Sequence, residues 1–303
     1  MIDVFLTAAL AVVLTSGIAC NSSDEDTTPD EVEVQVTNED NEKQSKPRDD
    51  PNKQPNTPTP PSNSNKKKSR VVGPASASPT AKLCYALGAR QVKADDEDRV
   101  VGINFDGSDL NDLGLQQLGK INGLEAVKSI RLSEAPITDE GIQHLAAFSN
   151  LNELVLDYTR INGSGLSKLT GLSKLRDLHL YKTSINDEGM ANVGQLQQLE
   201  GLSIGGSLRI TDDGIAEIAK LSKLKKLVIG GLQITDKGIE HLTALDKLER
   251  VGLSSSQITD AGVLHLEKLT NIKLLSLTTP RVSDAAVTRL RSILPDCKVI
   301  RAK

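Results

Sequence analysis

Apolar and polar positions follow one repeating pattern over the last two thirds of the chain. The segment Leu151–Leu156 has apolar residues at its first, fourth and sixth positions, and it recurs every 24 residues, once after 25. An additional three residues separate the first copy from the second. The copies begin at Val100, Val127, Leu151, Leu175, Leu199, Leu224, Leu248 and Ile272. Eight copies in one frame indicate a single structural unit stacked on itself.

Each repeat changes its hydrophobic period partway along. Leu154 and Leu156 are apolar positions two residues apart, which is the period of a strand with one buried face. Later positions show helical spacing, as in Ile239 and Leu242. Between the two stands an Ile-Thr-Asp-x-Gly turn such as 234–238, in which Thr suits an N-cap and Asp suits the positive end of the helix dipole. The pattern predicts one strand, one turn and one short helix per repeat.

No such unit can bury its own apolar faces, so the repeats must stack into one core. Parallel strands then line one side and the wider helices the other, which bends the stack with the strands on the concave side. The Leu-x-x-Leu-x-Leu and Ile-Thr-Asp-x-Gly segments of residues 100–296 closely resemble the leucine-rich-repeat family, as found in many bacterial envelope proteins and in F-box substrate receptors. The resemblance implies an α/β fold, a curved leucine-rich-repeat solenoid of about eight repeats with N- and C-terminal caps.

One row of turn residues departs from that family. Where the family places a ladder of Asn, this chain has Thr159, Thr183 and Ser256, but Ala135, Leu232 and Pro280 in other repeats. Hydroxyl groups can satisfy some of the turn amides in place of Asn. We expect a less regular ladder.

The ends of the stack need covers. Residues 81–99 are predicted to form the N-terminal cap, with a helix at Leu83, Ala86 and Leu87 that stops at Gly88, and with Gln91 to Lys93 pairing with Arg99 to Phe105. Residues 297–303 are expected to add a C-terminal strand. Cys84 and Cys297 would then be buried at opposite ends, too far apart for a disulfide.

The N-terminus has the character of an export signal. The length of the apolar run from Val4 to Ala19 suits a signal peptide over residues 1–20 better than a membrane span of about 20 residues. Residues 16–20, Ser-Gly-Ile-Ala-Cys, resemble a bacterial lipobox, which implies lipid attachment at Cys20 and an exported, membrane-anchored lipoprotein of the outer membrane, periplasm or cell surface. A secreted protein cleaved near Ala19 and a non-cleaved anchor remain alternatives.

Residues 21–80 have the composition of a tether. Nine of the twelve prolines lie between Pro29 and Pro79, among Asn, Ser, Thr and charged residues, and such a segment cannot bury enough apolar surface to fold. It also carries the net charge, because residues 1–80 hold 12 acidic and 8 basic side chains whereas residues 81–303 hold 28 of each. A neutral folded part with few aromatic residues argues against a nucleic-acid partner.

The candidate catalytic residues all occupy recurrent repeat positions, where a role in the fold already accounts for them. His144, His241 and His265 share one helix position, which other repeats fill with Gln, Lys, Asn, Glu or Arg, so we expect surface residues. Asp212 and Asp213 belong to the helix start rather than to an acid–base pair. No metal-ligand spacing, phosphate loop or nucleophile–base pair is found. The sequence therefore predicts no enzyme activity, metal or cofactor.

The concave face is the candidate binding surface. If Leu154 and Leu156 point into the core, the residues between and after them point onto the inner curve. The third and fourth repeats then present polar and aromatic side chains, and the next two an almost bare floor around Gly205 and Gly230. The predicted ligand-binding residues are Arg131, Glu153, Asp157, Tyr158, Asp177, His179 and Tyr181. The alternative is that strand residues on an exposed face are polar by default.

These observations favour a monomeric, non-catalytic binding module of the cell envelope. Its partner would be a protein, peptide or glycan recognised through the concave face, and its lipid would hold it to the membrane. One alternative is a structural envelope protein without a specific ligand. Another is an F-box-like substrate receptor, which the export signal and the absence of an apolar helical pattern in residues 21–80 disfavour.

Overall fold

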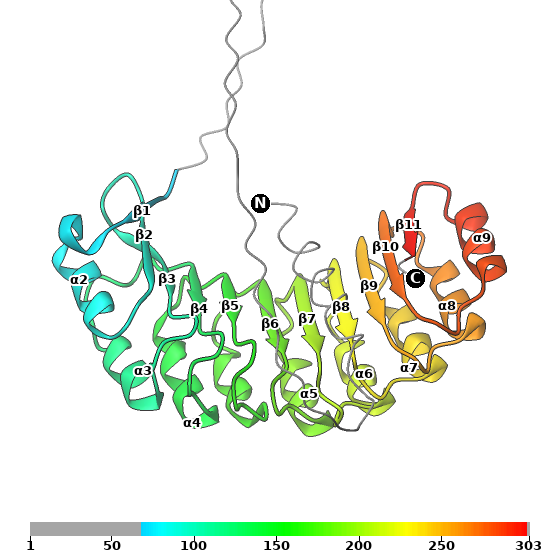
Figure 1. The fold of residues 1–303 in the computed structure, drawn as a ribbon, viewed down its shortest axis with the longest axis horizontal. Coiled ribbons are helices and arrows are strands. Elements are labelled where there is room, and N and C mark those ends of the chain that lie inside the picture. The colour runs from blue at the N-terminus through cyan, green and yellow to red at the C-terminus, as the bar shows by residue number, and fades with distance from the viewer. Residues whose placement is uncertain (1–67, 302–303) are drawn as a thin grey trace, which may run out of the picture. The chain divides into compact units, whose positions relative to one another are not determined.

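The computed structural model describes residues 68–301 of the chain, in which short helices and strands alternate (Figure 1). The strands are β1 (Arg70–Val72), β2 (Gln91–Ala94), β3 (Val100–Asn104), β4 (Ser129–Arg131), β5 (Glu153–Val155), β6 (Asp177–Tyr181), β7 (Gly201–Gly205), β8 (Lys226–Gly230), β9 (Arg250–Ser254), β10 (Leu274–Thr278) and β11 (Lys298–Arg301). The α-helices are α2 (Pro79–Ala86), α3 (Asp112–Leu118), α4 (Asp139–Ile142), α5 (Asp187–Val193), α6 (Asp212–Ile218), α7 (Asp236–His241), α8 (Asp260–His265) and α9 (Asp284–Ile293). The 3-10 helices are η1 (Pro74–Ser76), η2 (Gln143–Ala147), η3 (Ser164–Leu169), η4 (Leu242–Ala244) and η5 (Leu266–Lys268).

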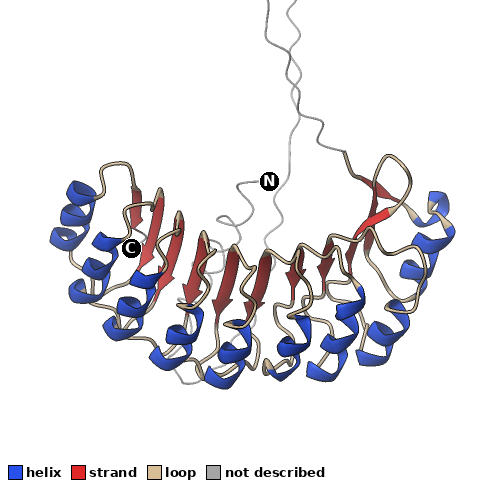
Figure 2. Ribbon diagram, turned by 180° about the vertical axis from the view of Figure 1, so that it is seen from behind, coloured by secondary structure: helices blue, strands red, loops and turns tan. Residues whose placement is uncertain are grey.

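The strands form one sheet in which β1 to β11 follow each other in sequence order. All neighbours from β3 to β11 are parallel, and β2 is antiparallel to both β1 and β3. Within this repeat unit the strands line the concave side and the helices the convex side (Figure 2). The predicted solenoid is confirmed, as is the pairing of Gln91–Lys93 with the strand that follows.

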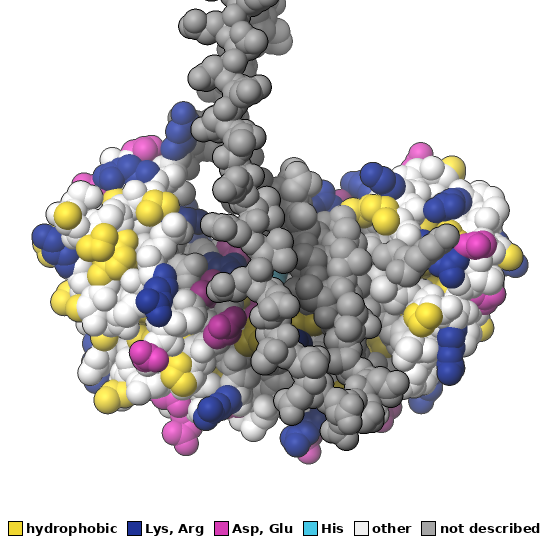
Figure 3. All heavy atoms as spheres, in the orientation of Figure 1, with side chains coloured by type: hydrophobic (Ala, Val, Ile, Leu, Met, Phe, Trp, Pro, Cys, Tyr) yellow, Lys and Arg dark blue, Asp and Glu magenta, His cyan; other side chains and the backbone are white. Residues whose placement is uncertain are grey.

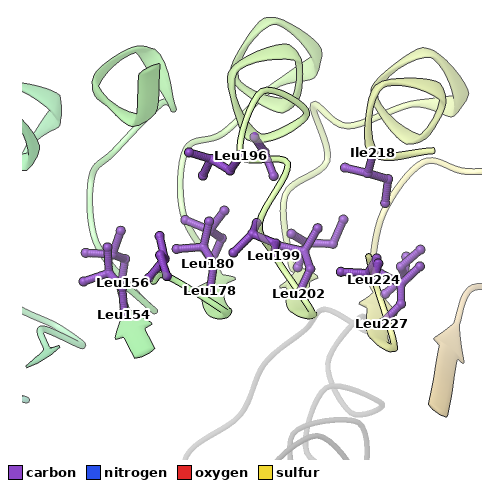
Figure 4. Close-up of a cluster of buried hydrophobic side chains, with 14 of the residues drawn as sticks. Leu154, Leu156, Leu178, Leu180, Leu196, Leu199, Leu202, Ile218, Leu224 and Leu227 are labelled. Carbon is purple, nitrogen blue, oxygen red and sulfur yellow. The ribbon is translucent and has the colours of Figure 1, made fainter. Parts of the chain in front are cut away.

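The core lies between the sheet and the helices. Leu154 and Leu156 are fully buried, and their counterparts in neighbouring repeats stack beside them (Figure 4). Side chains from the helices and descending loops, such as Leu196 and Ile218, close the same layer from the convex side. Each repeat thereby buries its apolar face against the next, which is why one repeat could not fold alone.

A ladder of hydrogen bonds joins the helix starts of successive repeats. The Asp212 carboxylate accepts the Thr235 amide (2.8 Å) and the Thr235 hydroxyl (2.7 Å) from the next repeat. The Thr235 hydroxyl oxygen also accepts the Lys237 amide, so this residue caps its own helix as predicted. The same arrangement joins Asp112 to Thr138, Asp187 to Thr211, Asp236 to Thr259 and Asp260 to Ser283.

The ladder explains the glycine of the Ile-Thr-Asp-x-Gly turn. A Cβ atom on Gly238 would lie 2.4 Å from Oδ1 of Asp212 in the preceding repeat, well inside van der Waals contact. Glycine therefore leaves the space that the neighbouring carboxylate occupies. The turn motif is a contact between repeats as well as a helix start.

The third repeat departs from the predicted strand, turn and α-helix. Its Ile-Asn-Gly-Ser-Gly segment at 161–165 lacks the Thr-Asp pair, and the helix that follows is the 3-10 helix η3. Asp139 of the preceding repeat instead accepts three amides, from Asn162 (2.7 Å), Gly163 (3.0 Å) and Gly165 (2.8 Å). Gly163 has a φ of 95°, which glycine adopts without strain and which turns these amides toward one carboxylate.

The N-terminal cap is longer than the sequence predicted, so the boundary between tether and cap at residues 80 and 81 is wrong. Strand β1 already pairs with β2, and Val72 is 3% exposed. The Tyr85 hydroxyl donates to the Val72 carbonyl and accepts the Val92 amide. The polar composition of residues 21–80 as a whole had hidden the β-branched pair Val71 and Val72. The predicted signal peptide, Cys20 and the tether up to residue 67 lie outside the described residues.

The capping helix buries a different face from the one expected. It begins at Pro79 behind the N-cap Ser78, and Gly88, with a φ of 96°, follows its end as predicted. However, it packs through Ala81 and Cys84, whereas Leu83 is 51% exposed. Burial raises the pKa of the Cys84 thiol to about 11. Cys84 and Cys297 are both free and buried, as their predicted positions in the two caps of the repeat stack implied.

The hydroxyls of Thr159 and Thr183 lie in the turns as predicted, but they donate to the carbonyls of Leu156 (2.7 Å) and Leu180 (3.3 Å) rather than accept turn amides. In the seventh repeat the prediction is off by one residue, because Ser255 is buried and donates to a carbonyl of the preceding repeat whereas Ser256 is exposed. No helix within residues 68–301 is long and apolar enough to cross a membrane.

Candidate ligand-binding surface

The structure brings the seven predicted residues onto three adjacent strands and the turns that follow them. Arg131, Val155 and His179 form one row across β4, β5 and β6, and Glu153 and Asp177 form the next. Asp157, Tyr158 and Tyr181 lie at the ends of β5 and β6, beyond these rows. All seven predicted side chains therefore share one part of the concave sheet.

Most of the charges in this surface are engaged with each other. Arg131 Nε donates to Asp106 Oδ2 (2.8 Å), and Asp106 Oδ1 accepts the Ser133 amide. The Ser129 hydroxyl donates to Glu153 Oε2 (3.0 Å). Asp177 Oδ1 lies 3.7 Å from Lys226 Nζ. Single acidic or basic side chains here are parts of a network, so each fixes the position of its neighbour.

Burial shifts the titration of three members of the network. It raises the pKa of Asp157 to about 6, although the Tyr181 amide at 2.7 Å from Oδ1 and the charge of Arg131 oppose the shift. Burial also raises the pKa of Asp177, against the attraction of Lys226. The same cause lowers the pKa of His179 to about 4, against the attraction of Glu153. At neutral pH, His179 is therefore a neutral imidazole between charged neighbours.

Asp157 and His179 should give opposite pH dependences of stability. Because folding raises the pKa of Asp157, its contribution is complete below about pH 4 and is lost as the pH rises through about 6. Folding lowers the pKa of His179, so its contribution is complete above about pH 6.5 and is lost as the pH falls through about 4. In the wild type the pH dependences of stability from Asp157 and His179 partly cancel.

Asp157→Asn should remove the pH-dependent contribution of Asp157 to stability and leave that of His179 in place. The free energy of unfolding of the variant, relative to wild type, should increase steadily between about pH 4 and pH 6. Urea denaturation followed by circular dichroism across this range measures it. A difference between variant and wild type that does not change with pH would contradict the raised pKa of Asp157.

Two tyrosines and a lysine cover the end of this surface. The Tyr158 and Tyr181 rings meet edge to face with centroids 5.8 Å apart. Lys182 Nζ lies 5.1 Å from the Tyr158 centroid and 5.8 Å from that of Tyr181, within the range of cation–π attraction. Tyr158 is 44% exposed. Lys182 is not among the seven predicted residues, although it directly follows Tyr181 in the sequence.

The predicted bare floor is partly wrong. A Cβ atom on Gly205 would lie 2.6 Å from the Gly230 carbonyl oxygen and 2.7 Å from Cε2 of Tyr181, and one on Gly206 would lie 2.6 Å from Cγ of Lys182. These glycines leave room for side chains of the preceding repeat rather than for a ligand. At Gly230, which is buried, a Cβ would meet only the Ser254 Cβ, at 3.5 Å, so this position has room for a small side chain.

The convex face carries the three predicted surface histidines. His144 lies in η2, and His241 and His265 end α7 and α8; all three are partly exposed. Residues 68–301 contain no group of three or more His, Cys, Asp or Glu side chains placed to hold a metal ion. Outside the grey atoms, acidic and basic side chains are mixed over the visible face (Figure 3).

Residues 126–301 match the family model described as a leucine-rich repeat region. Among solved structures, internalin C2 from Listeria monocytogenes is similar at 23% identity, covering 67% of this chain and 81% of its own, with a TM-score of 0.51. Another internalin of that organism has 18% identity, 74% coverage of each chain and a TM-score of 0.43. A leucine-rich-repeat protein of Leptospira interrogans has 22% identity, coverages of 61% and 50%, and a TM-score of 0.41. No curated protein matches the chain significantly.

Proposed function

Because the chain belongs to the leucine-rich-repeat family, we propose that it is a binding module that recognises a protein or peptide through the concave face of β4, β5 and β6. Leucine-rich-repeat proteins are in general non-catalytic scaffolds, and their fold is typical of protein-binding modules. The fold leaves the ligand to the surface side chains, so the proposal depends on the site itself.

The observation that supports this site most is the exposed Tyr158 beside Tyr181, at the end of a fixed charge network. Tyrosine is enriched in binding hot spots, because its large ring contributes apolar contact at low entropic cost. Arg131 is held by Asp106 at 2.8 Å, and Asp177 lies 3.7 Å from Lys226. A surface held in its binding conformation loses less entropy when a partner docks.

Replacing Tyr158, His179 and Tyr181 together by Ala should weaken binding of an isolated partner by about a hundredfold, because it removes both aromatic contacts and the side chain between them. Affinity capture from envelope extracts identifies the partner, and calorimetry with the purified pair measures the loss. The matched control is Ser254→Ala with Thr278→Ala, which changes the positions of Tyr181 in two later repeats. Equal affinity of the triple variant and the wild type would reject the site.

We also propose that the module is exported and held to a membrane through lipid on Cys20. The support is the apolar run from Val4 to Ala19 and the small residues before the cysteine. Cys20→Ser should abolish incorporation of labelled palmitate and release the protein from the membrane fraction. Labelling that persists in this variant would contradict a lipid at Cys20.

A further inference from the structure

One turn position shows backbone strain in the middle repeats. The eighth residue of a repeat lies in the turn that follows the strand. It has a left-handed backbone in six repeats, at Gly107, Glu134, Tyr158, Lys182, Gly206 and Gly231. Three repeats use glycine, which adopts this conformation without penalty. Tyr158 (φ 59°) and Lys182 (φ 50°) are bulky residues, for which a positive φ is rare and unfavourable. Such strain concentrates at functional sites.

Backbone hydrogen bonds do not explain why Tyr158 and Lys182 stand there. Their amides donate to the Tyr181 carbonyl (2.7 Å) and the Gly205 carbonyl (2.6 Å), bonds that any residue could make. Gly206 and Gly231 make equivalent bonds in the following repeats. Tyr158 is 44% exposed, and Lys182 is exposed as well. The two side chains therefore contribute surface rather than core.

The surface around them is basic and apolar. Arg160 and Arg209 are exposed on the same turns, two and three residues beyond Tyr158 and Gly206, and within residues 68–301 neither they nor Lys182 form a salt bridge. Leu208 is 68% exposed and belongs to the one turn that is a residue longer than its counterparts. Neighbouring strands are about 4.8 Å apart, so the turns of β5, β6 and β7 form one continuous edge.

We propose that this edge, formed by Tyr158, Arg160, Tyr181, Lys182, Leu208 and Arg209 and here termed the basic rim, binds an acidic segment of a partner protein that also carries an apolar side chain. The inference rests on the proposed function, because the two tyrosines belong to both surfaces. Carboxylates of the segment pair with Lys182 and the two arginines, which have no other ionic partner among the described residues. Leu208 and the exposed ring of Tyr158 take the apolar side chain.

Charge complementarity selects this occupant. The rim bears three cations in a folded part whose charges balance overall, and Glu134, at the same turn position in the second repeat, marks its acidic boundary. An anionic glycan would match the cations but would leave Leu208 without an apolar partner. A neutral segment would leave the cations unpaired.

The test uses the full chain and a fluorescein-labelled peptide of glutamate–glutamate–leucine repeats, with fluorescence anisotropy at low salt. Lys182→Gly, and separately Arg160→Glu with Arg209→Glu, should each weaken binding by about tenfold.

Lys182→Gly should leave the melting temperature unchanged or raised, because Gly206 and Gly231 occupy the equivalent turns. A structural role of Lys182 would instead lower it. Arg281→Glu, at the position of Arg160 in the eighth repeat, is the matched control and should bind as wild type.

Two results would overturn the inference: no binding of the glutamate peptide, or equal binding of its lysine counterpart. Direct binding of a sulfated polysaccharide in place of the peptide would assign the rim to an anionic glycan instead. The two proposals fail separately. If the triple alanine variant loses its partner while the arginine variant keeps it, the concave site stands and the basic rim is wrong. If the rim variants lose the peptide while the triple variant keeps its partner, the rim stands and the concave site is wrong.

Discussion

Gly165→Ala should lower the free energy of unfolding by about 3 kcal/mol. A Cβ atom at this position would lie 2.4 Å from the Asp139 carbonyl oxygen and 3.1 Å from the Asp139 carbonyl carbon and Cα. These are backbone atoms of the preceding repeat, so no side-chain rotation relieves the clash. The two repeats would have to move apart, and the hydrogen bond from the Gly165 amide to Asp139 Oδ1 would lengthen or break.

Gly171→Ala is the matched control. It lies six residues further along, and a Cβ there meets no atom within 4 Å. Alanine at this site should leave stability unchanged or raise it slightly, because it restricts the unfolded chain. Urea denaturation of both variants, read by circular dichroism, separates the effect of close packing from the general effect of replacing glycine. Similar midpoints for the two variants would show that the repeats tolerate a side chain at Gly165.

Asp212→Ala should cost about 2 kcal/mol of stability. The carboxylate accepts both the amide and the hydroxyl of Thr235, and its loss leaves those two donors without their partner at the contact between repeats. Because repeat proteins are stabilised by interfaces between neighbours, a loss at one interface weakens the cooperative unit on both sides. The thermal midpoint and the urea midpoint should fall together.

Asp213→Ala tests whether the effect belongs to the ladder or to charge at the helix start. Asp213 is the next residue, is exposed and lies in the same first turn of α6. Its removal alters the helix dipole interaction by a few tenths of a kcal/mol, about 0.5 at most. Equal losses for the two variants would assign the stability of this turn to helix electrostatics and not to contacts between repeats.

Much of the candidate site could be predicted because a strand has a period of two. Once Leu154 and Leu156 are assigned to the core, Glu153 and Asp157 must face the other side, and the 24-residue spacing places Asp177 and Tyr181 beside them. Which side chains pair could not be predicted in this way. The Arg131–Asp106 and Asp177–Lys226 contacts depend on rotamers and on the distance between strands, and a one-dimensional pattern carries neither.

The start of the N-terminal cap and the buried hydroxyl in the turn of the seventh repeat show a second limit of prediction from sequence patterns. Composition averaged over residues 21–80 concealed the short strand β1, whose formation depends on a partner strand 20 to 24 residues away. Counting positions from the repeat start placed Ser256 where the structure has Ser255, because backbone dihedrals in the turn decide which hydroxyl points inward. Local patterns do not record these dihedral angles.

The sequence by itself determined the stacked repeat, the side of the sheet that is buried and the residues that share the concave face, since each follows from periodicity and from the need to bury apolar surface. Only the tertiary structure decided why Asp and Gly recur in the turn, because the Asp carboxylate and the space above the glycine belong to different repeats. It also decided that Tyr158 and Lys182 adopt a left-handed backbone at an exposed edge. Contacts between neighbouring repeats have a geometry that spacing alone does not contain.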